Sequence, residues 1–215
     1  MKSVLLIGMS KFGQSLGQKL LNMGTEVMIV DKDEEKINQL APKYTDALIT
    51  NCMNEENLKA LDVPAFDACV VAIGDDFQSS LEITSILKDL GAKHVVSKAN
   101  TEIQRKFLLK NGADEVVYPD RDIAEKLAVK LNSSKVYDYI ELNNEYSIFE
   151  IAVPQKWSGK KIVEINPRKK YGINILTIKK ENDFVSSPNA EYVFETGDHM
   201  LVFGLTDQIL AFTNR

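Results

Sequence analysis

The sequence contains few of the residues from which metal sites and catalytic centres are usually built. Among 215 residues there are only two cysteines and two histidines. Cys52 and Cys69 lack CxxC spacing, so we expect no zinc site made from these four side chains. Cys69 stands in an apolar run and is expected to be a small buried side chain. His94 opens a strand-like segment, which favours a structural role over a catalytic one.

Long hydrophobic runs and an excess of basic charge are also missing. No apolar run approaches the roughly 20 residues that a transmembrane helix needs. The apolar N-terminal segment leads directly into a glycine motif, which favours a first strand over a signal peptide. The net charge of −5 argues against nucleic acid as the main partner, because phosphate binding needs a basic face. We therefore expect a cytoplasmic protein that is able to dock on a membrane protein.

What the sequence does contain is a regular alternation of strand-like and helical segments over its first half. The strand-like runs are residues 3–8, 26–31, 46–50, 67–74, 94–98 and 115–119. The helical stretches are residues 11–24, 33–44, 54–61, 77–91, 101–112 and 121–134. Continuous apolar strands separated by helices are typical of a parallel sheet that is covered on both faces. The pattern predicts an α/β fold with a Rossmann-like, doubly wound parallel sheet.

The pattern changes after Ser133 and Ser134, where we place the domain boundary. Residues 137–154 read as strand, polar turn and strand, an amphipathic segment covers 160–172, and strands follow at 173–180 and 199–204. We predict a nucleotide-binding domain over 1–133 and a small α+β domain over 134–215. The apolar stretch 136–142 is expected to be a crossover element that needs a partner subunit.

The loop after the first strand is close to the Gly-x-Gly-x-x-Gly pattern of dinucleotide-binding proteins. Gly8 is expected to make the tight turn and Gly13 to allow close packing of the helix on the sheet. Ser10 replaces the middle glycine, which hampers the approach of a pyrophosphate but leaves a hydroxyl able to donate to it. The helix N-terminus still offers free N–H groups, and Lys11 adds a cation.

Asp31 ends the second strand, where an acidic side chain receives the ribose hydroxyls in this fold. An acid at this position disfavours a 2′-phosphate, so ADP, ATP or NAD fits better than NADP. The alternative is a turn that serves packing alone, with Asp31 acting as an ordinary helix N-cap.

Four segments together resemble a known family, namely residues 5–39, 70–81, 110–128 and 168–179. They are similar to the cytosolic regulatory subunits of Trk/Ktr-type potassium uptake systems, which carry an N-terminal and a C-terminal RCK domain. The resemblance extends in order over essentially the whole chain. It implies a homo-oligomer, a dimer or an octameric ring, beneath a membrane-embedded potassium-translocating subunit. It also implies that ATP or ADP, or NADH or NAD, bound to the N-terminal domain controls transport, and that the C-terminal domain of some members binds cyclic di-AMP.

The resemblance also implies roles for individual residues. Asn51 aligns with an acidic residue that meets the adenine amino group, and the alternative is an ordinary polar loop residue. Lys98 matches a lysine that reaches the phosphates, and the family usually has Gly and Arg at Ser10 and Lys11. The expected cofactor-binding residues of the first domain are Gly8, Ser10, Lys11, Phe12, Gly13, Asp31, Lys32, Asn51, Cys52, Ile73, Gly74 and Lys98.

Two further sites follow from the resemblance. Asp120 aligns with an acid that helps to hold Mg²⁺ or Ca²⁺ between paired nucleotides, and the alternative role is a helix N-cap. Arg168, Asn174 and Ile175 match the segment that binds cyclic di-AMP, with Ile165 and Pro188 as apolar platform residues. The alternative is that the isoleucines simply alternate along a strand of a small core.

These features favour a ligand-gated regulatory subunit without catalytic activity. The alternative is a small NAD-dependent oxidoreductase, although the second domain is thin for a substrate domain and histidines are scarce. A transcriptional redox sensor is a third reading, against which stand the acidic charge and the absence of a helix-turn-helix pattern.

Overall fold

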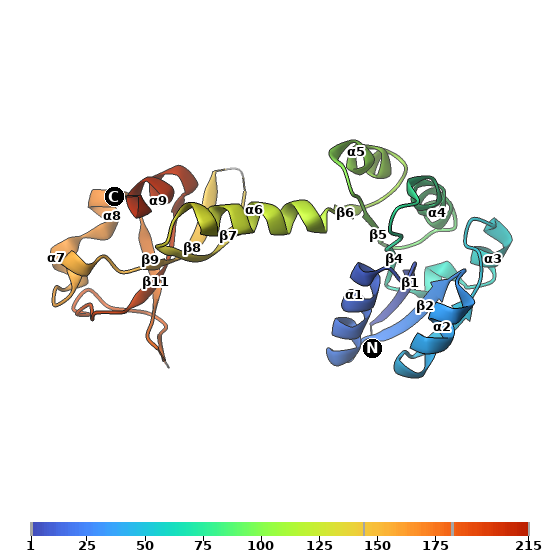
Figure 1. Cartoon of the computed structure of the whole chain (residues 1–215), viewed down its shortest axis with the longest axis horizontal. Coiled ribbons are helices and arrows are strands. Elements are labelled where there is room, and N and C mark those ends of the chain that lie inside the picture. The colour runs from blue at the N-terminus through green and yellow to red at the C-terminus, as the bar shows by residue number, and fades with distance from the viewer. Residues whose placement is uncertain (1, 144, 182, 215) are drawn as a thin grey trace. The chain divides into compact units, whose positions relative to one another are not determined.

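In the computed structural model, which describes residues 2–143, 145–181 and 183–214, the strand-like runs of the first half form one parallel sheet (Figure 1). Its strands are β1 (Ser3–Ile7), β2 (Glu26–Asp31), β3 (Asp46–Ile49), β4 (Ala68–Val71), β5 (Val95–Lys98) and β6 (Glu115–Val117). Their order is β3-β2-β1-β4-β5-β6, and all five pairings are parallel. Strands β1 to β3 follow one another toward one edge of the sheet, and β4 to β6 follow one another toward the other edge. The strand order therefore reverses between β1 and β4, and the predicted Rossmann-like fold is confirmed.

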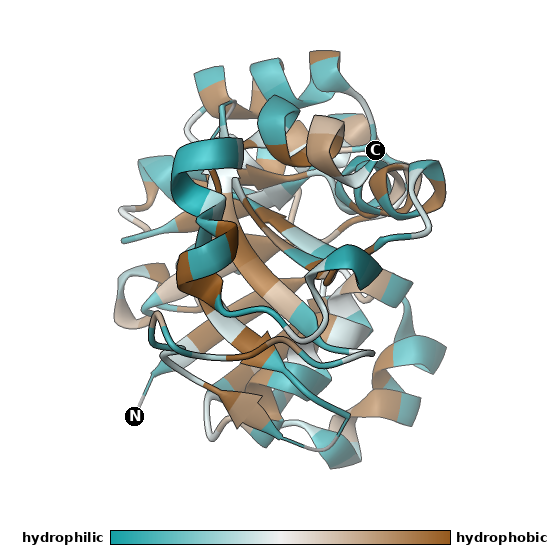
Figure 2. Ribbon diagram, turned by 90° about the vertical axis from the view of Figure 1, so that its left-hand side faces the viewer, coloured by the Kyte–Doolittle hydropathy of each residue, from teal (hydrophilic) through white to brown (hydrophobic). Residues whose placement is uncertain are grey.

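The connecting helices begin where the sequence offers capping side chains. They are α1 (Lys11–Asn22), α2 (Glu34–Leu40), α3 (Glu55–Lys59), α4 (Phe77–Asp89) and α5 (Glu102–Lys110), with 3-10 turns at Ala41–Lys43 and Val63–Ala65. The N-cap side chains that accept a backbone N–H are Ser10, Asp33, Asn54, Asp76 and Thr101. Apolar clusters lie between the helices and the sheet, as expected for strands that are largely hydrophobic. The ribbon coloured by hydropathy shows hydrophobic (brown) segments along the strands (Figure 2).

Two glycines allow helix α1 to pack closely against the sheet. Gly8 has a φ of +88°, and a Cβ there would lie 2.8 Å from the Ile73 side chain. A Cβ on Gly13 would lie 2.5 Å from the carbonyl oxygen of Gly8 and 3.1 Å from the Cβ of Ala72. The roles that we predicted for these two glycines, the tight turn and the close packing, are confirmed.

Helix α6 (Pro119–Asn132) contains the point at which the chain divides into two compact units, Met1–Arg121 and Asp122–Arg215. The division falls before Ser133 and Ser134, so residues 122–132 belong to the second unit. The boundary at 133/134 between functional domains stays a prediction. Because the helix begins at Pro119, Asp120 lies inside its first turn, and the N-cap alternative for this residue is wrong.

The second unit is built on an antiparallel sheet. Its strands are β7 (Val136–Glu141), β8 (Tyr146–Ala152), β9 (Asn174–Lys179), β10 (Phe184–Val185) and β11 (His199–Leu205), in the order β10-β9-β11-β8-β7. The shorter elements are a 3-10 turn (Gln155–Trp157), α7 (Ile162–Ile165), α8 (Pro167–Tyr171) and α9 (Thr206–Thr213). Helices beside an antiparallel sheet confirm the small α+β domain.

Two details of this unit differ from the sequence-based expectations. Residues 136–141 form β7, which pairs with β8, so this stretch is a strand and not a crossover element. Helix α9 was not predicted, because Leu205 at its N-cap gives no capping side chain. The helix is nevertheless held by Ile209 and Phe212, which enter the core around the buried Trp157.

Replacing Gly13 with alanine tests the close packing of α1. The added methyl group meets the backbone of Gly8, so the helix has to move, and we expect unfolding to become easier by about 1–3 kcal/mol. Urea unfolding followed by circular dichroism measures this loss. Ser15→Ala is the control on the exposed face of the same helix and should change stability by less than ~0.5 kcal/mol. Equal stability of Gly13→Ala and wild type would show that α1 does not depend on this approach.

Candidate functional site

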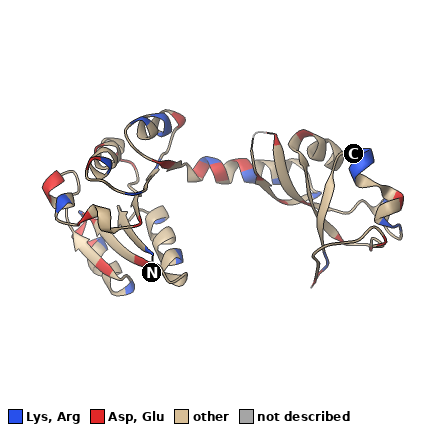
Figure 3. Cartoon of the chain, turned by 180° about the vertical axis from the view of Figure 1, so that it is seen from behind, with Lys and Arg blue, Asp and Glu red and all other residues tan. Residues whose placement is uncertain are grey.

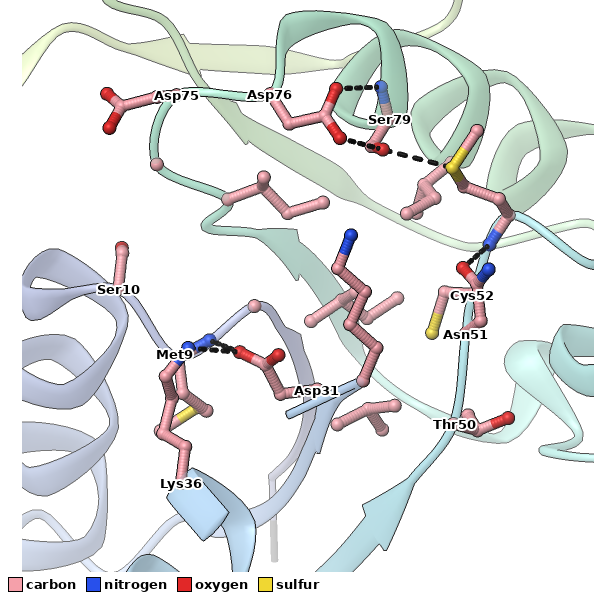
Figure 4. A pocket seen from close by; sticks show the side chains of 18 residues that line it. Met9, Ser10, Asp31, Lys36, Thr50, Asn51, Cys52, Asp75, Asp76 and Ser79 are labelled. Carbon is pink, nitrogen blue, oxygen red and sulfur yellow. Dashed lines mark hydrogen bonds and ion pairs between the residues drawn. The ribbon is translucent and has the colours of Figure 1, made fainter. Parts of the chain in front are cut away.

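A cavity of about 410 Å³ opens at the carboxyl ends of β1, β2 and β4 (Figure 4). This is the edge at which parallel α/β sheets bind ligands, and the volume suits a small molecule. The predicted residues that line the cavity are Gly8, Ser10, Asp31, Lys32, Asn51, Cys52, Ile73 and Gly74. The other lining residues are Ile7, Met9, Val30, Lys36, Thr50, Met53, Asp75, Asp76, Ser79 and Ile83.

Four of the predicted cofactor-binding residues do not line this cavity. Lys11 is exposed at the first position of α1, and Phe12 packs against the apolar cluster beneath the helix. Gly13 is buried beside Gly8, where it serves packing. Lys98 ends β5, which is separated from β1 by β4. Their roles in binding a nucleotide stay predictions.

The Ser10 side chain connects the first loop to the end of β4. Its hydroxyl donates to the carbonyl oxygen of Ala72 at 2.6 Å and accepts the N–H of Gly13 at 3.4 Å. A hydroxyl has a single hydrogen to donate. While the bond to Ala72 holds, Ser10 is therefore unable to donate to a ligand phosphate. The backbone N–H groups at the α1 N-terminus remain as donors, as does the ammonium group of Lys32 in the cavity lining.

The Asp31 carboxylate is held by its surroundings at the ribose position of the fold (Figure 4). Its Oδ2 accepts the N–H of Met9 at 2.7 Å and lies 3.3 Å from the Nζ of Lys36, and its Oδ1 accepts the N–H of Asp33 at 3.1 Å. The side chain of Asp31 is only 11% exposed. Asp33 caps α2, and the N–H and ammonium groups of Lys36 lower the pKa of its carboxyl group. The cap role considered for Asp31 thus belongs to Asp33.

The wall after β3 is a tight turn that begins at Asn51. Its side-chain oxygen accepts the N–H of Met53 at 3.1 Å, and its main-chain oxygen accepts a hydrogen bond from Asn57 at 3.0 Å. This turn fixes which end of the Asn51 amide is oxygen. Burial, with a contribution from the charge of Asp31, raises the pKa of the neighbouring Cys52 thiol to about 12. Cys52 is therefore protonated near neutral pH and acts as an apolar wall residue.

The opposite wall is the turn between β4 and α4. Asp76 accepts the hydroxyl of Ser79 at 2.6 Å and its N–H at 3.0 Å. These two bonds, with a smaller contribution from the charge of Lys32, lower the pKa of the Asp76 carboxyl group. The side chain of Asn100 donates to the carbonyl oxygen of Gly74 at 2.8 Å and so holds the same turn.

Sequence reasoning missed Met9, Lys36 and the Asp76–Ser79 pair. A signal existed for Lys36 and Asp76, because each belongs to the first turn of a helix that follows a strand: Asp76 caps α4, and Lys36 stands three residues after the cap Asp33. No local pattern pointed to Met9, which contributes its backbone N–H to Asp31.

The remaining predicted site residues lie away from this cavity. Asp120 is exposed on α6, and among the described residues no three His, Cys, Asp or Glu side chains are placed to hold a metal ion together. Arg168 lines a separate cavity of about 420 Å³ with Lys169, Lys170 and Tyr171. Asn174 donates to the carbonyl oxygen of Phe203 at 3.5 Å, and Ile175 packs against the core of the second unit. Ile165 is buried in that core, which prevents it from being an exposed platform residue.

Charge is mixed over the surface of the chain. Acidic and basic side chains alternate along α6, and the basic residues of α8 form the most evident local concentration (Figure 3). Within the described ranges, no helix has the length and apolar character to cross a membrane.

Comparison with known proteins agrees with this architecture. The TrkA-N domain model matches residues 4–119, and the TrkA-C domain model matches residues 146–215. The chain is 38% identical to the Ktr system potassium uptake protein C of Bacillus subtilis, over 100% of this chain and 97% of that protein. It is 37% identical to the Ktr system potassium uptake protein A of the same organism, over 99% of this chain and 96% of that protein.

A solved structure described as the GsuK channel bound to NAD has the same fold, with a TM-score of 0.70 and 16% identity, over 99% of this chain and 39% of that one. Both halves of the sequence thus match models and proteins of one kind, in the same order. The chain belongs to the family of Trk- and Ktr-type potassium uptake proteins that combine a TrkA-N with a TrkA-C domain.

Proposed function

We propose that this chain is the cytoplasmic regulatory subunit of a Trk/Ktr potassium uptake system and that an adenine nucleotide bound in its first unit controls transport by a membrane-embedded partner. One observation carries this proposal: the similarity to Ktr potassium uptake proteins runs through both units and nearly the full length of each chain. A protein that shared only a nucleotide-binding fold would match in the first unit alone.

The cavity of the first unit supports an adenine nucleotide, ATP or ADP, or NAD or NADH, as the ligand. Asp31 stands at the ribose position, and the N-terminus of the 12-residue helix α1 provides N–H groups and a dipole for the phosphates. Apolar side chains for the base come from Val30, Met53 and Ile83. Gly8, with a φ of +88°, makes the tight turn that leads from β1 to this helix N-terminus. When bound, the nucleotide would supply a charge that differs between its forms.

Regulation then rests on a shift of populations. A nucleotide moves an equilibrium between two shapes of an assembly only by as much as its affinities for the two shapes differ. The pocket is formed by loops from β1, β2, β3 and β4. A ligand that spans them therefore senses small movements between these loops.

The chemistry of the cavity supports binding without catalysis. The Cys52 thiol, with a pKa of about 12, is a poor nucleophile near neutral pH. The hydroxyl of Ser10 donates to a backbone carbonyl, and the lowered pKa of Asp76 makes it a weak general base. Neither His94 nor His199 is among the residues that line the cavity. An NAD-dependent oxidoreductase remains the alternative that turnover of NADH would favour.

Self-association is supported by helix α6. Ile123, Leu127 and Leu131 recur every four residues on this helix and are 67%, 52% and 77% exposed. Residues four apart lie on one face, so these side chains form an apolar stripe that a second copy would cover. We propose a dimer or a larger ring, positioned at the inner face of the cell membrane through the transport partner.

Two further ligands belong to the same proposal. Cyclic di-AMP would contact Arg168 of the second unit. Arg168 is exposed and has no ion pair among the described residues. Asn174 and Ile175 follow it closely in sequence, at the start of β9. Mg²⁺ or Ca²⁺ at Asp120 would need additional ligands from nucleotide phosphates or from a second copy.

Asp31→Asn tests the ribose contact with little change of shape. Loss of the charge-assisted bond to a ribose hydroxyl should cost about 1.5–3 kcal/mol, or roughly ten- to a hundredfold in affinity for ADP. Isothermal titration calorimetry measures the change, and circular dichroism verifies folding. An unchanged dissociation constant would remove Asp31 from the site. Asp114→Asn, at a carboxylate beside β5 outside this cavity, serves as the control.

Ser10→Gly tests the replaced glycine. Because the Ser10 hydroxyl is bonded to Ala72, we expect nucleotide affinity to be kept or improved in this variant. The protein itself should lose about 0.5–1.5 kcal/mol of stability with that hydrogen bond. Calorimetry and urea unfolding separate the two effects. A tenfold fall in affinity would mean that the hydroxyl contacts the phosphates.

Light scattering tests self-association. At micromolar concentration the mass should be at least twice the 24.1 kDa of one chain. Leu127→Glu places a charge in the apolar stripe of α6 and should lower that mass, whereas Lys130→Glu, an exposed charge reversal on the same helix, should not. A wild-type mass of one chain would contradict the proposed assembly.

A further inference from the structure

The Asp31 carboxylate has fewer free acceptor positions for ribose hydroxyl groups than a carboxylate without protein partners. An ionised carboxylate has about four acceptor positions. Three groups already occupy Asp31, namely the N–H groups of Met9 and Asp33 and the ammonium of Lys36. Roughly one position is left, which is enough for one hydroxyl of a ribose. The second hydroxyl oxygen has to find a different partner.

Lys36 is placed to be that partner. It belongs to the first turn of α2 and lines the cavity, with its Nζ 3.3 Å from Oδ2 of Asp31 and 3.5 Å from Oδ2 of Asp33. Its backbone is fixed by the bond from its own N–H to the side chain of Asp33 at 3.0 Å. An ammonium group has three hydrogens, so one remains after both carboxylates are served. The side chain is 36% exposed and can adjust to a ligand.

Lys36 also changes the charge that a ligand meets beside Asp31. In this fold an acid at the end of the second strand binds the 2′-hydroxyl, whereas a nearby cation accommodates a 2′-phosphate. Here the acid and the cation are both present, in contact with each other at the same end of the cavity. Lys32 adds a second lysine to the same lining. A 2′-phosphate would thus meet an ammonium group as well as a carboxylate.

We propose that Lys36 contacts the 2′-oxygen of the ribose and makes this pocket tolerant of a 2′-phosphate, so that the protein accepts 2′-phosphorylated adenine dinucleotides of the NADPH class. This inference rests on the proposed binding of an adenine nucleotide in the cavity. It departs from the expectation, based on Asp31 alone, that a 2′-phosphate is disfavoured.

The test is the ratio of two dissociation constants, measured by calorimetry on the full-length chain for NADPH and NADH, which differ only by the 2′-phosphate. ADP is titrated in parallel to report on the proposed function. Wild type should bind NADPH within about tenfold of NADH. Lys36→Met should raise the NADPH/NADH ratio at least fivefold, and Lys36→Arg should keep it. Lys110→Met removes the same charge at the last turn of α5, outside the cavity, and should leave the ratio unchanged.

Three results would overturn the inference. With ADP bound by wild type, absent NADPH binding or NADPH bound more than tenfold more weakly than NADH contradicts it while leaving the proposed function intact. A ratio that is the same in Lys36→Met and wild type removes Lys36 from the contact. If ADP, NADH and NADPH all fail to bind to the folded protein, the proposed function fails and the inference fails with it. The wild-type ratio needs no variant, so it decides the matter even if Lys36→Met does not fold.

Discussion

The close approach of helix α1 to the sheet is the constraint on which the first unit depends. Gly13 lies against the carbonyl oxygen of Gly8, and no side chain larger than hydrogen fits between them. This contact brings the N-terminus of α1 to the ends of β1 and β4, where Ser10 bonds to Ala72. It also places the N–H of Met9 2.7 Å from the Asp31 carboxylate. A helix further from the sheet would separate its N–H groups from the ribose position and leave no single cavity.

Electrostatic balance is the second requirement of the site. Asp31 is almost buried, and a buried charge is tolerated only when it is paired or hydrogen-bonded. Two backbone N–H groups and Lys36 meet this need before any ligand arrives. Because these groups occupy acceptor positions of the carboxylate, they also limit how many hydroxyl groups of a ligand it can accept. Across the cavity, Asp76 is held in a similar way by Ser79, so hydrogen bonds within the protein fix both carboxylates before a ligand binds.

The sequence predicted the parts of the fold that depend on local patterns. The six parallel strands, the glycine turn and the acid at the end of the second strand were all predicted, because apolar runs and glycine spacing reflect backbone geometry directly. The roles of Lys11 and Lys98 in the pocket were harder to judge, since they depend on which face of α1 is exposed and how far β5 lies from β1. The place of Lys36 in the cavity lining was not predicted, because it depends on the turn that begins α2. The uncapped helix α9 was missed because only its tertiary packing holds it.

Nucleotide binding by the wild-type chain is the property on which the proposed regulation depends. Thermal unfolding in the presence of ADP, ATP and NADH is the most direct measurement, since a ligand that binds only the folded state raises the melting temperature. At a hundredfold excess over its dissociation constant, a bound nucleotide should stabilise the fold by about 2.7 kcal/mol. The same samples should show no consumption of nucleotide. Superimposable melting curves with and without every nucleotide would contradict the account.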